Sequence, residues 1–254
     1  MGLCQTGNSV VKFCTVAIVV FGAAELCAAG ILQSAEAAAA RRAAGQAKSA
    51  AVVAAERAAW QKIAREADAS AVQNIQRRFG DYLPRSGQVL PPARVLTREE
   101  FDLHLQRHFP DMTAERRKAI LGYHKGGAVV VNMNDQQFIL TLAHERLHQL
   151  AHPRFRETFG HGLNEGVTER LAKMTARDLH LIDLPPVYTL EQSLAETLGA
   201  RAGFDRVQRA YFKGEIGQLR DFIDADLGAG TFKRFVAASN RGDLTLAQQI
   251  LIGR

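Results

Sequence analysis

His144, Glu145 and His148 form a His-Glu-X-X-His sequence whose residue types and spacing could bind and use a metal ion. On an α-helix, residues four apart leave the same face, separated by about 6 Å of rise. Two neutral imidazole nitrogens can therefore reach one metal ion. Glu145 lies about 100° round the helix from His144, so its carboxylate can reach a water molecule on that metal. The spacing thus predicts a metal site that activates water.

Such a site needs a third protein ligand, and four nearby residues could supply it. They are His152, His161, Glu165 and Glu169. His152 is poorly placed, because helical rise puts its Cα about 12 Å from that of His144. His161 lies in a predicted turn between two glycines. Glu165 begins a predicted helix that could return antiparallel to the first. We therefore favour Glu165, with His161 as the alternative.

The segment Leu163-Asn164-Glu165-Gly166 adds a resemblance to a known family. A His-Glu-X-X-His motif followed by Leu-Asn-Glu-Gly is similar to the gluzincin metallopeptidases, in particular to their aminopeptidase branch. The resemblance covers about residues 125–215. It implies a zinc ion held by His144, His148 and Glu165. It also implies that a carboxylate one turn later, here Glu169, hydrogen-bonds a zinc-binding histidine.

The function that the resemblance implies is zinc-dependent hydrolysis of peptide bonds, with a peptide or protein as substrate. Glu145 would be the general base that takes a proton from water and passes it to the leaving amine. Tyr188 is the preferred donor to the developing oxyanion; the alternatives are Tyr123, Tyr211 and His180. Peptidases of this type pair the substrate backbone with an edge strand, and residues 127–132 are predicted to be that strand.

Arg146 departs from the usual motif, in which this position is uncharged. Helical geometry directs it away from the histidines, where we expect it to be exposed. Sixteen residues separate His148 from Glu165, slightly fewer than in the best-known members of the family. These two departures support an alternative function, that of a catalytically inactive zincin-like binding or scaffold protein anchored at a membrane.

Charge and cysteine content limit the other functions. The chain has 254 residues and a net charge of +6. Residues 81–254 hold 23 Lys and Arg against 21 Asp and Glu, so the positive excess belongs mainly to the N-terminal region. This near neutrality gives nucleic-acid binding little support, and we expect no nucleic-acid partner. All three cysteines lie in the first 27 residues, so they cannot form a disulfide framework or a metal site in the predicted catalytic domain.

Residues 10–32 are hydrophobic apart from Lys12 and Glu25. The uninterrupted apolar stretch is twelve residues, which is short for a membrane span and typical of a signal peptide. We therefore expect a signal peptide or membrane anchor in residues 1–33. The protein would then be secreted, periplasmic or membrane-anchored, with possible membrane association through residues 10–32.

The remaining chain divides at a Pro- and Gly-rich stretch around residues 80–93. Before it, residues 34–80 are rich in alanine and predict a long, weakly packed helical arm. After it, residues 81–254 predict an α+β, mostly helical, zincin-like metallopeptidase domain. Pro153 is expected to end the helix that carries the motif. Strands are predicted at 93–96 and 127–132, and helices at about 97–108, 113–121, 135–151, 165–179, 190–201, 204–213, 215–227, 230–239 and 244–252.

Overall fold

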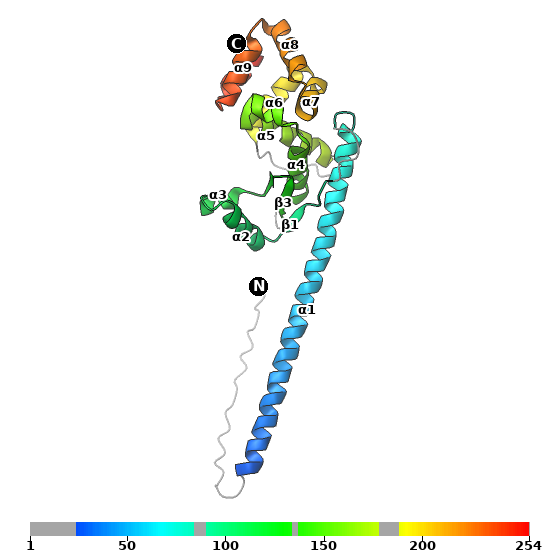
Figure 1. The fold of residues 1–254 in the computed structure, drawn as a ribbon, viewed down its shortest axis with the longest axis vertical. Coiled ribbons are helices and arrows are strands. Elements are labelled where there is room, and N and C mark those ends of the chain that lie inside the picture. The colour runs from blue at the N-terminus through cyan, green and yellow to red at the C-terminus, as the bar shows by residue number, and fades with distance from the viewer. Residues whose placement is uncertain (1–23, 84–89, 134–136, 178–187, 254) are drawn as a thin grey trace, which may run out of the picture. The chain divides into compact units, whose positions relative to one another are not determined.

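The computed structural model of the chain describes residues 24–83, 90–133, 137–177 and 188–253 (Figure 1). Helix α1 (Ala24–Phe79) contains the alanine-rich segment, as alanine's high helix propensity predicts. The chain forms two compact units, Met1–Arg57 and Ala58–Arg254. Within the second unit, Ile75 and Phe79 of α1 are buried in the core.

The predicted hydrophobic segment 10–32 lies largely outside the described residues. Within the described part of the chain, no helix is both long enough and apolar enough to cross a membrane.

A small three-stranded sheet lies beside the motif helix. Its strands are β1 (Arg94–Leu96), β2 (Gly122–Lys125) and β3 (Ala128–Asn132). The order is β1-β3-β2, with β1 parallel and β2 antiparallel to β3. The prediction that residues 127–132 form an edge strand is therefore wrong, because β3 pairs on both sides. The outer strand on one side is β2, which the sequence did not predict.

Helices α2 (Arg98–His108) and α3 (Ala114–Ala119) form between β1 and β2. Helix α2 begins at a capping box formed by Thr97 and Glu100. Glu100 donates its backbone N–H to the Thr97 hydroxyl, and the Glu100 carboxylate accepts the backbone N–H of Thr97. Thr113 caps α3 in a similar way, because its hydroxyl accepts the N–H of Arg116.

The motif lies on α4 (Phe138–Leu150), and the next helix, α5 (Pro153–Arg177), runs back past it. Pro153 ends one helix, as predicted, but it also opens the next, where its missing N–H costs nothing. Helix α5 kinks at Gly160, whose φ of 77° is unfavourable for residues with a Cβ. The predicted helix 165–179 is the part of α5 that follows this kink.

The described residues 188–253 form five further helices, close to their predicted positions. They are α6 (Thr189–Ala202), α7 (Phe204–Lys213), α8 (Ile216–Leu227), α9 (Thr231–Asn240) and α10 (Leu244–Leu251). Buried aromatic residues of α5, α7 and α9, including Phe155, Phe159, Tyr211 and Phe235, form the main core with α4. The motif helix therefore lies between this helical core and the sheet (Figure 1). The described structure is mostly helical with a small sheet, consistent with the predicted α+β class.

Candidate metal centre

Packing on both sides fixes the helix that carries the two histidines. Residues Leu140 to Leu147 of α4 are all buried, because one face meets the helical core and the other meets the sheet. Helix α5 brings Glu165 to the same place. Gly166, the next residue, lies against α6: a Cβ there would be 2.0 Å from the carbonyl oxygen of Glu191. Glu165 thus faces the candidate metal centre, while Gly166 allows α5 and α6 to pack closely beside it.

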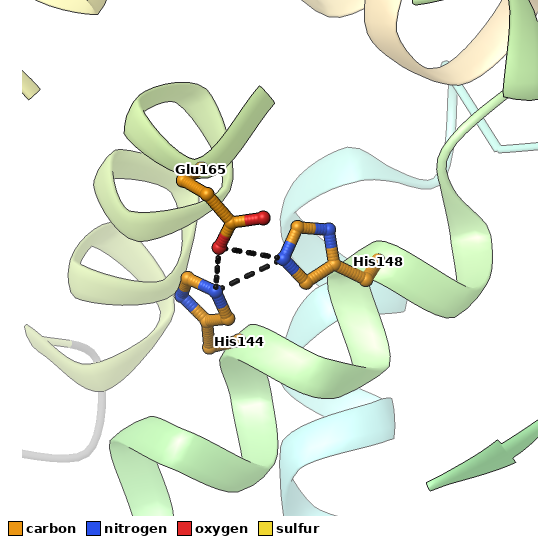
Figure 2. Close-up of side chains that lie close together, drawn as sticks. All are labelled: His144, His148 and Glu165. Carbon is orange, nitrogen blue, oxygen red and sulfur yellow. Dashed lines mark hydrogen bonds and ion pairs between the residues drawn. The ribbon is translucent and has the colours of Figure 1, made fainter. Parts of the chain in front are cut away.

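Three side-chain atoms converge between α4 and α5, as Figure 2 shows. The Nε2 atoms of His144 and His148 are 3.0 Å apart, and each lies 3.2 Å from Oε2 of Glu165. Ligand atoms about 2.1 Å from one tetrahedral ion would be separated by about 3.4 Å. The triangle is therefore close to the size of a three-ligand metal site. His144, His148 and Glu165 are the three residues predicted to bind the metal, and together they could hold a metal ion.

His144 is oriented from behind by a second carboxylate. Its Nδ1 donates to Oε2 of Glu169 at 3.2 Å, and Lys173 Nζ lies 3.3 Å from the other oxygen of Glu169. Glu169 is thus in the place that the resemblance implied. This bond keeps a proton on Nδ1 of His144 and directs its Nε2 toward Glu165 and His148.

His148 is oriented by hydroxyl groups rather than by a carboxylate. Thr168 donates its single proton to the backbone carbonyl of Asn164 at 2.7 Å. Its oxygen can then only accept, from the Tyr211 hydroxyl at 2.7 Å and from Nδ1 of His148 at 3.3 Å. The side-chain nitrogen Nδ2 of Asn164 lies 3.1 Å from the same Nδ1, and exchanging the two ends of this amide would let its oxygen accept from the ring instead. With the amide in that exchanged orientation, both the Thr168 hydroxyl and Asn164 accept from the ring, and the His148 proton is on Nδ1.

When both histidines are neutral, as metal binding requires, three electron pairs face one another at the centre of the site. With both histidine protons on Nδ1, both Nε2 atoms present lone pairs, and the Glu165 carboxylate can only accept. A cation satisfies such a set, and two imidazoles with one carboxylate suit a borderline metal such as zinc. The residues present thus fit a bound divalent metal ion.

Electrostatics of the cluster agree with an attraction for positive charge. Burial alone would lower the pKa of His144, but its contacts with Glu165 and Glu169 outweigh burial and raise the pKa to about 10. Burial lowers the pKa of His148. For Glu165, burial opposes ionisation, yet hydrogen bonds from the histidines hold its pKa well below the usual range. The surroundings that hold a proton on His144 also favour a metal cation.

Glu145 lies beside the cluster on the wall of a cleft of about 700 Å³. Burial raises the pKa of its carboxyl group to about 7. Its side chain packs against Gly122 of β2, where an added Cβ would be 3.1 Å from Cγ of Glu145 and 2.7 Å from Cγ2 of Thr141. The absence of a side chain at Gly122 therefore lets the outer strand approach the motif helix. No pattern in the sequence indicated this contact.

Tyr188, the predicted oxyanion donor, lies at the cluster. Its ring stacks on that of His144, with centroids 5.7 Å apart, and it lines the cleft. Burial, followed by the nearby carboxylates, raises the pKa of Tyr188, so the hydroxyl keeps its proton and can donate. Of the alternatives, Tyr211 is fully buried and Tyr123 is hydrogen-bonded to His104. His180 lies outside the described residues.

The other two candidate histidines take different positions. His161 precedes Glu165 by one helical turn, is mostly exposed, and places Nδ1 3.1 Å from Oε1 of Glu165. It therefore contacts the opposite oxygen from the one that faces the two motif histidines. His152 accepts the backbone N–H of Arg154 through Nδ1 and lines the cleft beyond α4.

Arg146 corrects one prediction. It is only 1% exposed, because α1 covers the face of α4 that carries it. Its Nε donates to Oδ1 of Asp68 at 2.7 Å, and its Nη atoms donate to Gln149, to Asp68 and to the carbonyl of Pro91. The charged residue within the motif therefore pairs with α1 on the side away from the cluster.

The cleft in front of the cluster has two different walls. One comprises α4 and α5 with His148 and Glu165 of the candidate metal centre. The other is formed by β2 and α3, including Gly122, Tyr123 and Arg116. A substrate in this cleft would lie between the cluster and the outer strand of the sheet.

Comparisons of the chain with known protein families, with curated proteins and with solved structures gave no match.

Proposed function

We propose that the protein is a zinc-dependent peptidase of the gluzincin type. The observation that carries the proposal is the convergence of three electron pairs, from His144, His148 and Glu165, beside a cleft lined by Glu145. The neighbouring sheet supports a zincin-like arrangement, since its antiparallel outer strand lies along the same cleft.

The proposed reaction is hydrolysis of a peptide bond. A zinc ion bound by His144, His148 and Glu165 would polarise the scissile carbonyl and lower the pKa of a water molecule. Glu145 accepts a proton from that water molecule while the water oxygen bonds to the carbonyl carbon. It then donates the proton to the amine as the carbon–nitrogen bond breaks. Tyr188 donates a hydrogen bond to the oxygen that becomes negative.

Substrate alignment is assigned to β2. One edge of this strand pairs with β3, and the strand stands last in the order of the sheet. An extended peptide could pair with its other edge and pass in front of Glu145, which packs against Gly122. This pairing replaces the predicted role of residues 127–132.

The alternative of an inactive binding or scaffold protein loses one of its two supports. Arg146 is buried against Asp68 and does not intrude on the cluster. The proposed location stays secreted, periplasmic or membrane-anchored, and it rests on the hydrophobic segment 10–32.

Substitution Glu145→Gln tests the proposal, because it keeps the size of the side chain and removes the base. We expect the variant to bind one zinc ion per chain, measured by mass spectrometry of the metal, and to lose hydrolysis of a proteome-derived peptide mixture. Unchanged turnover with full zinc content would contradict the role of Glu145. A zinc-loaded wild-type protein that cleaves no peptide in the mixture would contradict the proposed activity.

A further inference from the structure

The walls of the cleft carry positively charged side chains besides the residues of the candidate metal centre. Two arginines line it, Arg116 from α3 and Arg156 from α5, together with the histidines His124, His152 and His161. The carboxylates that line it in the described part of the chain are Glu145 and Glu165. Both already have partners or roles in the proposed chemistry, so the lining has no further carboxylate to neutralise the arginines.

Both arginines are exposed. Within the described residues, no carboxylate lies in ion-pair distance of either side chain. By contrast, Arg170, Arg201, Arg209 and Arg220 each pair with an Asp or Glu. The two cleft arginines are therefore available to a ligand at little cost in broken ion pairs.

Guanidinium groups bind carboxylates through two parallel hydrogen bonds, and a cleft of one charge attracts ligands of the other. A bound metal ion would add further positive charge. A free α-amino group or a lysine side chain would meet no spare carboxylate among the described lining residues. The charge of the cleft therefore favours an anionic group close to the scissile bond.

We propose that the cleft selects peptides that carry a carboxylate near the scissile bond, and that Arg116 and Arg156 bind that carboxylate. This inference rests on the proposed peptidase function and narrows its substrate class. The carboxylate can come from an Asp or Glu side chain or from the peptide's C-terminus. Recognition of a free N-terminus is disfavoured by the same charges.

The test uses zinc-loaded, full-length protein and four eight-residue alanine peptides. Three peptides are acetylated at the N-terminus and amidated at the C-terminus, and carry two Glu, two Gln or two Lys. The fourth carries two Gln and has a free C-terminal carboxylate. We expect kcat/KM to be about tenfold higher for the Glu peptide, or for the free-carboxylate peptide, than for the amidated Gln peptide, and lowest for the Lys peptide. Whichever of the Glu peptide and the free-carboxylate peptide has the higher kcat/KM identifies the source of the carboxylate.

A matched pair of double variants then assigns the preference to the cleft. Substitutions Arg116→Glu and Arg156→Glu should abolish or reverse it. Substitutions Lys118→Glu and Arg154→Glu change the charge equally on the same two helices, at exposed positions that do not line the cleft, and should leave it unchanged. Equal cleavage of all peptides by the wild-type protein, or equal loss of preference in both double variants, would overturn the inference.

Binding separates this inference from the proposed activity. Calorimetry with the zinc-loaded Glu145→Gln variant measures peptide affinity without turnover. Tighter binding of the carboxylate peptides without any cleavage by the wild-type protein would support the cleft's selectivity and overturn the peptidase proposal. Cleavage with no charge preference would support the peptidase proposal and overturn the selectivity of the cleft. If no peptide binds and none is cleaved, both the inference and the proposed activity are overturned.

Discussion

The two walls of the cleft are built in contrasting ways. The metal-binding wall consists of buried residues on α4 and α5, and each histidine is fixed from behind by Glu169 or by Thr168. The opposite wall consists of the half-buried strand β2 and the short helix α3, which has no buried residue. We therefore expect metal affinity to depend on a buried hydrogen-bond network. We expect substrate selection to depend on the shape and charge of an exposed wall.

The largest effect should come from removing a ligand on the buried wall. We expect Glu165→Ala to weaken zinc binding by more than the roughly 100-fold that loss of an outer partner causes. Competition with a chelator measures the affinity. His161→Ala is the control, because His161 contacts the other oxygen of Glu165 from an exposed position. If His161→Ala loses zinc and Glu165→Ala keeps it, the third ligand is His161.

The contact behind the motif helix should control stability rather than chemistry. Asp68→Ala leaves the Arg146 charge buried without its main partner, which costs about 3 kcal/mol in the free energy of unfolding. Urea denaturation measures this cost. Asp205→Ala removes an exposed partner of Arg209 and should cost less than about 1 kcal/mol. Equal losses in the two variants would show that the Arg146–Asp68 pair does not fix α4.

The hydroxyl behind His148 should have a smaller but specific effect. Thr168→Val keeps the shape of the side chain and removes the acceptor for His148 Nδ1, so zinc affinity should fall about 10- to 100-fold. Thr175→Val is a close match. Thr175 is also buried on α5 and also donates to a backbone carbonyl, but it has no contact with the cluster. Equal zinc affinities in the two variants would contradict the orienting role of Thr168.

The smallest of these effects concerns the exposed wall. Gly122→Ala introduces a methyl group that would collide with Thr141 and Val131 and press on Glu145, so β2 must shift. We expect kcat/KM to fall about tenfold while zinc affinity stays the same. Gly217→Ala adds a methyl group in open space on α8 and should have no effect on activity. A loss of zinc in Gly122→Ala would mean that the two walls are not independent.

The contrast between the walls also explains what the sequence could predict. Helical spacing was sufficient to place His144 and His148 on one face, and the Asn-Glu-Gly segment was sufficient to propose Glu165. The first depends on local helix geometry, and the second depends on the resemblance to the gluzincins. The positions of α6 to α10 were also predictable from local sequence signals.

The missed features depend on long-range contacts. Helical geometry correctly directed Arg146 away from the histidines, but it could not show that Asp68, 78 residues earlier, would cover it. Strand β2 is only four residues long and owes its conformation to pairing with β3. Nothing in the local sequence distinguished Thr168 from other helix residues, because its hydrogen-bond partner Tyr211 lies 43 residues later in the chain.

The short outer strand has a consequence for the solution behaviour of the protein. An open strand edge that accepts a substrate can also accept another copy of the same chain, which is how many proteins begin to aggregate. Strand β2 limits this hazard because it offers only four residues and ends at the exposed Lys125. The glycine turn that follows, Gly126-Gly127, reverses the chain at once. We expect such an edge to pair with one extended peptide and not to nucleate a growing sheet.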